Sequence, residues 1–211
     1  MRSPRSTPVT AGDLFPLFLK LERRRCVVVG AGRVAEGKIA GLLSCGADVY
    51  VVAPRATRRV RGWARRGRLR WQRERFQARH LRRAFLVVVA TSSPAVQQQV
   101  YRQARRAGIL CNSVDDPGRC DFYYPAVVRR GALQIAISTA GLSPALAQRL
   151  RRQLQRQFGP EYAEWLVQLG EKRRRLLGES LSGERRRRLL HRMASSRALS
   201  AFSRPGHAPS K

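Results

Sequence analysis

The sequence predicts an α/β fold with a parallel sheet, followed by a strand-rich segment and a small helical domain. Apolar runs of strand length alternate with helical patterns in the first half of the chain, and a glycine turn joins the first run to the first helix. Further on, strand follows strand, and then only helical patterns remain. We therefore expect a Rossmann-like NAD(P)-binding domain over residues 1–116, a strand-rich dimerisation segment over 117–142, a helical domain over 143–194 and a disordered tail over 195–211.

The glycine turn is the stretch around which the first domain is organised. Residues 26–29 form an apolar, strand-like run, and Gly30 then allows a tight turn. Gly32 removes the side chain where the backbone must approach a pyrophosphate, and the helix amides that begin at Arg33 point at the anion. The alternative is an ordinary turn between a strand and a helix. The predicted cofactor-binding residues of this turn are Gly30, Ala31, Gly32, Arg33 and Val34.

The elements on either side of this turn complete one βαβ unit. Residues 12–21 are apolar and interrupted by Pro16, so we expect an extended piece at the edge of the sheet that covers the core. The first helix should end at Gly46 with a left-handed cap. A strand over residues 48–52 follows.

The end of this second strand bears on the choice of cofactor. A dinucleotide fold usually has an Asp or Glu there for the ribose hydroxyls, but this chain has Ala53 and Pro54. Arg55, Arg58 and Arg59 could instead pair with a 2′-phosphate, or they could simply coat a solvated helix. We therefore predict NAD as cofactor, leave NADP open, and expect Ala53 and Pro54 to line the site.

A second group of cofactor residues follows the most apolar run of the chain. The elements expected before and including that run are a helix over residues 58–66, a strand over 69–71, a short helix over 76–81 and a buried strand over 84–90. Because ligands bind beyond the carboxyl ends of parallel strands, Thr91 and Ser92 are candidates to line the cofactor. Ser93 before Pro94 is a candidate helix N-cap.

Two adjacent carboxylates follow the next predicted strand. A helix over residues 95–107 and a strand over 109–114 lead to Asp115 and Asp116. Carboxylates at the carboxyl end of a strand, near a cofactor, are candidates for proton transfer. Asp116 begins an Asp-Pro-Gly turn signal and is interpreted as structural. Asp115 is the better chemical candidate.

The last part of the chain changes from strands to helices. Residues 122–130 and 133–139 flank Gly131 and Ala132, a pattern typical of a hairpin. An isolated two-stranded hairpin is only marginally stable, so it must extend another sheet or pair with a second subunit. We expect a homodimer. Ser143 and Pro144 should start a helix whose free amides offer a second anion site. The helices expected here span residues 146–158, 161–177 and 184–193.

The charge and the cysteines limit the class of partner. The net charge of +30 would attract nucleic acid, acidic lipid or a small polycarboxylate. The arginines are spread through the chain without an aromatic-interleaved patch, so we do not expect nucleic acid. The cysteines lack metal-site spacing, and no signal peptide or long apolar run is present, which indicates a cytoplasmic protein without a membrane segment. We expect His80, His191 and His207 at the surface, and no metal site.

Four blocks in this order resemble the siroheme synthase N-terminal-type family, the precorrin-2 dehydrogenase/sirohydrochlorin ferrochelatase proteins. The resemblance covers residues 14–190, and no methyltransferase module follows residue 211, so it implies the stand-alone form. The blocks are Phe15-Pro16-Leu17-Phe18-Leu19, residues 29–38 around the glycine turn, Cys111-Asn112-Ser113-Val114-Asp115-Asp116, and Ile137-Ser138-Thr139-Ala140-Gly141-Leu142-Ser143-Pro144.

The resemblance implies a reaction and a site. The family transfers a hydride from precorrin-2 to NAD and releases a proton, giving sirohydrochlorin; some members also insert Fe²⁺, which here would be only a chelatase substrate. Asp115 is implied as the catalytic residue, as a base or a positioning group. The block from Ser138 to Ser143 is implied in the tetrapyrrole site, with Thr139 where some members carry serine. The predicted substrate-binding residues are Asn112, Ser138, Thr139, Gly141 and Ser143, with Arg119 and Arg149 as partners for carboxylates.

Two other functions stay open at this point. One is an NAD(H)-sensing regulatory module that binds DNA through its basic surface. The other is a reductase for a different acidic metabolite.

Overall fold

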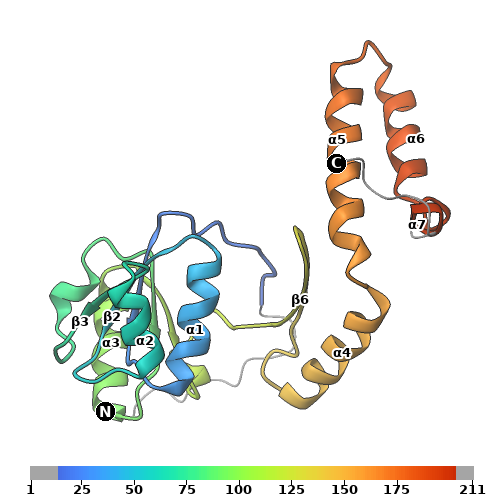
Figure 1. Ribbon diagram of the computed structural model, residues 1–211. Helices are drawn as coiled ribbons and strands as arrows, with labels where there is room; N and C mark the ends of the chain where they lie inside the picture. Colours follow the sequence, from blue (N-terminus) through green and yellow to red (C-terminus); the bar gives the residue numbers. More distant parts are fainter. Residues whose placement is uncertain (1–13, 203–211) are drawn as a thin grey trace. The chain divides into compact units, whose positions relative to one another are not determined.

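The computed structural model describes residues 14–202, and its contacts divide the chain into two compact units, one ending at Tyr123 and the other beginning at Tyr124 (Figure 1). The first unit is a five-stranded sheet of order β3-β2-β1-β4-β5 in which every neighbouring pair is parallel. The predicted Rossmann-like sheet is therefore confirmed. Its strands are β1 (Arg25–Val29), β2 (Asp48–Val52), β3 (Arg70–Gln72), β4 (Leu86–Val89) and β5 (Leu110–Ser113).

Helices cover both faces of this sheet because its strands are apolar on both sides. Cys26 and Val28 of β1 pack with α1 and α2, whereas Val27 and Val29 pack with α3 on the other face. All four side chains are buried. The helical elements of this unit are α1 (Arg33–Ser44), α2 (Arg58–Arg65), α3 (Pro94–Arg106) and the short 3₁₀ helices η1 (Ala78–Leu81) and η2 (Pro117–Arg119).

Two expectations for the first unit are wrong. Most of the segment before β1 does not cover the core: Phe15 is 83% exposed and Phe18 is 68% exposed, and only Leu21 at its end is buried in the core, while residues 12 and 13 lie outside the described part of the chain. His80 is buried rather than at the surface. Its Nδ1 accepts a hydrogen bond from the Gln77 amide (2.9 Å), and its Nε2 lies 3.1 Å from the Glu74 carboxylate. These contacts give His80 a structural role at the start of η1.

The second unit combines an antiparallel hairpin with helices. Arg130 pairs with Leu133 across the predicted Gly131-Ala132 turn, but the first strand begins at Ala126 rather than at residue 122. Pro125, immediately before it, has no N–H to donate to a ladder. The elements of this unit are β6 (Ala126–Arg130), β7 (Leu133–Ile137), α4 (Pro144–Gln157), α5 (Glu161–Gly178), α6 (Gly183–Met193) and α7 (Ser196–Phe202).

Arg130 and Gly131 fasten the hairpin to these helices. The Arg130 guanidinium donates to the carbonyls of Phe158 (2.7 Å) and Gln155 (2.8 Å), which are left without intrahelical partners at the end of α4. A side chain at Gly131 would approach the Ala163 methyl group of α5 to 3.1 Å. Hairpin and helices therefore form one packed body.

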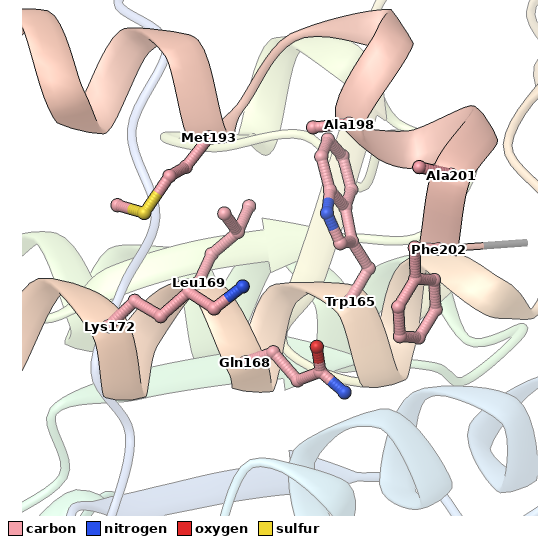
Figure 2. A pocket seen from close by; sticks show the side chains of 8 residues that line it. All are labelled: Trp165, Gln168, Leu169, Lys172, Met193, Ala198, Ala201 and Phe202. Atoms are coloured by element: carbon pink, nitrogen blue, oxygen red, sulfur yellow. The ribbon is translucent and has the colours of Figure 1, made fainter. Parts of the chain in front are cut away.

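Helix α7 corrects the prediction that the tail from residue 195 is disordered. In Figure 2, its small face, with Ala198 and Ala201, and the ring of Phe202 lie near the indole of Trp165 on α5. Together with Met193 of α6 and with Gln168, Leu169 and Lys172 of α5, these side chains line a pocket of about 270 Å³. The partner of α7 is distant in the sequence, so local composition cannot reveal it. Residues 203–211 lie outside the described chain.

Within residues 14–202, no helix is both long enough and apolar enough to cross a membrane.

Burial of two thiols predicts a loss of stability in alkali. Cys26 and Cys111 are fully buried, and burial raises the pKa of each thiol from 9.0 to about 12. The unfolded chain therefore releases these protons first, and the stabilising contribution, complete below pH 9.0, is lost as pH rises toward 12. Urea unfolding at a series of alkaline pH values should show a steeper fall for wild type than for Cys26→Ala or Cys111→Ala; equal slopes would contradict this.

Candidate active site

The predicted cofactor residues lie at one edge of the sheet. The turn at Gly30–Gly32 follows β1, Ala53 and Pro54 follow β2, and Thr91 and Ser92 follow β4. These three strands are neighbours and parallel, so their carboxyl ends meet. The strand order reverses between β1 and β4, which is where a doubly wound sheet opens a crevice for its ligand.

Gly30 is required by the approach of two backbones. Its φ is +108°, and a Cβ at this position would overlap the Ala90 carbonyl oxygen and lie 2.7 Å from the Ala90 carbonyl carbon. The Gly30 amide donates to the Val52 carbonyl (2.9 Å), and the Thr57 amide donates to the Ala31 carbonyl (3.1 Å). The glycine turn is thereby tied to the ends of both β2 and β4.

Gly32 leaves room for a ligand. No heavy atom lies within 4 Å of where its Cβ would be, and α1 begins there without a side-chain cap. The first backbone bond of the helix runs from the Glu36 amide to the Gly32 carbonyl, so the amides before Glu36 have no intrahelical acceptor. Open space in front of free amides at a helix N-terminus fits a pyrophosphate.

The residues that follow β2 and β4 are partly used by the fold itself. The Thr91 hydroxyl accepts from the Ser93 amide (3.3 Å), and the Thr91 carbonyl accepts from the Gln97 side chain (2.7 Å). Ser93 caps α3 as predicted, with its hydroxyl 3.5 Å from the Val96 amide. Ala53 is buried, and its carbonyl accepts from the indole of Trp71 (2.9 Å). Ser92 and Pro54 are exposed.

Asp115 lies at the tip of a tightly held turn after β5. Its backbone is left-handed (φ 64°), a conformation that Asp tolerates better than most residues, and its side chain is exposed. Asn112 is buried, and its amide donates to the Phe122 carbonyl (2.8 Å) and to the Cys120 sulfur (3.4 Å). Asn112 thus holds the turn that presents Asp115, and its predicted contact with a substrate stays a prediction.

Asp116 and Arg119 hold the base of the same turn. Arg119 donates to the Asp116 carboxylate and to the Gln98 side-chain oxygen (2.8 Å). The Asp116 carbonyl also accepts from the Cys120 thiol (3.2 Å). Asp116 is therefore structural, as predicted, and the Arg119 guanidinium, proposed for a substrate carboxylate, already has internal partners.

The sequence assigned no role to Lys38, whose charge interacts with that of Asp115. It lies on α1 and is half-buried, and this burial lowers the pKa of its ammonium group, while the charges of Asp115 and Cys120 act in the opposite direction. The pKa of Cys120 is raised by burial, and Lys38 is among the charges that oppose this shift. The Lys38 charge thus acts on both Asp115 and Cys120. The rarity of lysine in this arginine-rich chain was the one sequence signal for Lys38, because it is one of only four lysines among 43 basic residues.

The serine-rich block forms a capped turn in the second unit. The Ser138 hydroxyl accepts from the Ala140 amide (3.1 Å), and the Thr139 hydroxyl accepts from the Ser143 amide (3.2 Å). Gly141 has φ +81°. Ser143 caps α4 as predicted, accepting from the Leu146 amide (3.2 Å). Arg149 is exposed on the same helix.

No group of three or more His, Cys, Asp or Glu side chains that could hold a metal ion occurs in the part of the chain that the structure describes.

This fold and this turn define a dinucleotide-binding protein of the Rossmann-like class. Residues 17–126 match the family described as "Putative NAD(P)-binding", and residues 130–157 match "Sirohaem biosynthesis protein central". The solved structure titled "SirC, precorrin-2 dehydrogenase" is similar with a TM-score of 0.77 and 30% sequence identity, covering 89% of this chain and 92% of that one.

Relatives with curated names agree with these matches. The siroheme synthase of Nitrosospira multiformis is 38% identical over 185 residues, which are 86% of this chain and 39% of the relative. Siroheme synthase 2 of Yersinia enterocolitica is 39% identical over 157 residues, 74% of this chain and 33% of the relative. The chain thus spans between a third and two fifths of the length of these relatives. It belongs to the siroheme synthase N-terminal-type family.

Two glycine substitutions should separate folding from cofactor binding. Gly30→Ala introduces both a left-handed strain and an overlap with Ala90, so the free energy of unfolding should fall by about 2 kcal/mol or more. Gly32→Ala meets no neighbouring atom and should cost at most about 1 kcal/mol as a poorer N-cap. Urea unfolding and calorimetric titration with NAD measure the two effects. Gly32→Ala should lose at least about tenfold in affinity, and unchanged affinity would contradict a pyrophosphate at this turn.

Proposed function

We propose that this chain is an NAD-dependent precorrin-2 dehydrogenase that produces sirohydrochlorin in siroheme biosynthesis. The observation that carries the proposal is the combination, in one unit, of an open glycine turn suited to a pyrophosphate and a rigid turn that presents Asp115 after a strand of the same sheet. Membership of the siroheme synthase N-terminal-type family and the similarity to a precorrin-2 dehydrogenase support the choice of substrate.

The reaction removes two hydrogens from the macrocycle, one as a hydride and one as a proton. Bound NAD supplies the hydride acceptor. Gly30 and Gly32 let the backbone approach its pyrophosphate, and the first amides of α1 donate to it. The Asp115 carboxylate, exposed at the tip of its turn, accepts the proton or positions the ring that loses it. The positive charge of Lys38 interacts with this carboxylate.

The basic character of the chain suits a polycarboxylate substrate. A net charge of +30 attracts such a molecule over distances comparable to the Debye length, about 10 Å at 0.1 M salt. Ser138, Thr139, Gly141 and Ser143 offer hydroxyls and a helix N-terminus, and Arg149 offers an exposed guanidinium. We assign these residues to the substrate.

Anaerobic incubation with precorrin-2 tests the proposal. The sirohydrochlorin spectrum should appear together with reduced cofactor in equal amounts. Folded protein that binds NAD but gives no turnover with NAD or NADP would refute the proposed activity.

Asn substitutions at the two adjacent aspartates should have unequal effects. Asp115→Asn keeps a residue that tolerates the left-handed backbone but removes the base, so turnover should fall about 100-fold or more. Asp116→Asn serves as the matched control, because it only weakens the contact with Arg119 at the base of the turn. Reduced-cofactor absorbance measures the rates and titration measures NAD binding, which Asp115→Asn should leave unchanged. Equal losses in turnover would make Asp115 structural.

We further propose that two copies associate through the β6–β7 hairpin. One face of the hairpin packs on α4 and α5 through Val128, which is 1% exposed. The neighbouring positions Val127 and Ala136 lie on the opposite face and are not buried. Beside Arg129 and Gln134 on the same face, these two side chains form a small apolar patch on which a second copy can pack.

Val127→Asp should shift the protein from dimer to monomer in sedimentation equilibrium, because the new charge would be buried without a partner. Gln99→Asp introduces the same charge on the exposed side of α3 and should leave the dimer intact. A monomeric wild-type protein, or a dimeric Val127→Asp variant, would contradict the proposal.

The proposal has two further parts, iron insertion and a cytoplasmic location. Iron would be a substrate, and its insertion can be compared with the spontaneous rate in the same assay. All four cysteines are unpaired, as suits the reducing cytoplasm.

A further inference from the structure

The pocket between α5 and the two helices that follow it shares no residue with the proposed cofactor and substrate sites. It has a volume of about 270 Å³. Ligand pockets commonly measure roughly 300 to 1,000 Å³, so this one suits a small molecule. Its residues on α5 are spaced three and four apart and therefore share one face of that helix. They are Trp165, Gln168, Leu169 and Lys172, and the remaining walls are Met193 of α6 and Ala198, Ala201 and Phe202 of α7.

Most of the pocket wall is apolar. Figure 2 shows the Trp165 indole, Leu169, the Met193 thioether and the Phe202 ring around the space. The Trp165 ring is held edge-on to the ring of Tyr162, with the two centroids 5.7 Å apart. The α7 residues between these larger groups are alanines, which are too small to fill the space. The hydrocarbon part of a ligand therefore finds a preformed apolar surface on which to pack.

Three side chains of α5 add hydrogen-bond donors to this apolar wall. They are the indole N–H of Trp165, the carboxamide of Gln168 and the ammonium group of Lys172. None of the three side chains makes a hydrogen bond or an ion pair within residues 14–202. Trp165 and Gln168 are half-buried, and the N–H of a buried indole usually has an acceptor. These donors therefore lack an acceptor group.

The charges around the pocket favour an anion as that acceptor. No Asp or Glu lines the pocket, because the glutamates of α5 lie at other positions of the helix. Lys172 is followed on α5 by three exposed arginines, at positions 173–175. A carboxylate has two oxygens with about four acceptor sites, enough for all three donors. A cation would instead meet the Lys172 ammonium group without a compensating carboxylate.

We propose that this pocket binds a small apolar carboxylate, a hydrocarbon chain or ring that ends in one carboxylate group. The Lys172 ammonium group pairs with the carboxylate, the Trp165 and Gln168 side chains donate to it, and the apolar walls surround the hydrocarbon. Because residues of both α5 and α7 line the pocket, the bound ligand stabilises the packing of α7. The site lies in the second unit, and its existence does not depend on the proposed oxidation.

Octanoate, octan-1-ol and octylamine test the proposal, because they share one hydrocarbon chain and differ in the end group. In calorimetry at a salt concentration of about 0.15 M, octanoate should bind at least about tenfold more tightly than octan-1-ol, as expected for hydrogen bonds to a charged group. Octylamine should not bind. Absence of octanoate binding, equal affinity for octanoate and octan-1-ol, or tighter binding of octylamine would overturn the proposal.

Two neighbouring substitutions separate the pocket from the basic surface. Lys172→Met keeps the length of the side chain but removes its charge, so octanoate should bind about tenfold more weakly, while the affinity for octan-1-ol should stay within about twofold. Arg173→Met removes the same charge from the next position of α5, which does not line the pocket, and should leave the octanoate affinity within about twofold. Equal weakening by the two variants would mean unspecific attraction and would overturn the proposal.

The indole N–H signals of the tryptophans locate the bound ligand. In a nitrogen–proton correlation spectrum, octanoate should shift the signal of Trp165, which is identified by its loss in Trp165→Phe. The signals of Trp63 and Trp71 should not move, because both residues lie in the first unit. An unmoved Trp165 signal would exclude the carboxylate from this pocket. Failure of precorrin-2 oxidation together with the Trp165 shift would refute only the proposed activity.

Discussion

The close passage of Gly30 over the Ala90 carbonyl is the constraint on which the first unit depends. The contact is possible only without a side chain, and it brings the ends of β1 and β4 together where the strand order reverses. Hydrogen bonds from Gly30 to Val52 and from Thr57 to Ala31 then join the end of β2 to the same turn. Backbone contacts alone therefore bring the ends of β1, β2 and β4 together at this turn.

A second turn, after β5, is held by hydrogen bonds among its own side chains. Asn112, Cys120, Asp116 and Arg119 satisfy one another around the loop after β5, so that Asp115 projects from it without a structural contact of its own in the described hydrogen-bond pattern. Neighbouring side chains thus hold the turn, and the Asp115 carboxylate stays exposed. Lys38 on α1 links this turn to the glycine turn, because its charge interacts with Asp115.

The arginine-rich composition has different consequences at different positions. Arg130 completes the end of α4, Arg119 braces the Asp115 turn, and Arg59 packs on Trp63. These residues contribute to the fold. Arg58, Arg61 and Arg65, near Trp71, have no carboxylate partner among the described residues and add to the positive charge of the surface. A net charge of +30 therefore does not define one function.

The sequence by itself determined the parts whose causes are local: the βαβ unit around Gly30 and Gly32, the caps at Ser93 and Ser143, and the hairpin turn at Gly131. Strand and helix periodicity and turn chemistry operate within a few residues, so these elements could be predicted. Only the tertiary structure decided that His80 is buried, that α7 packs on Trp165, that Phe15 is exposed, and that the charges of Lys38 and Asp115 interact. Each of these depends on residues far apart in the chain, and burial or charge coupling between such residues leaves no local pattern.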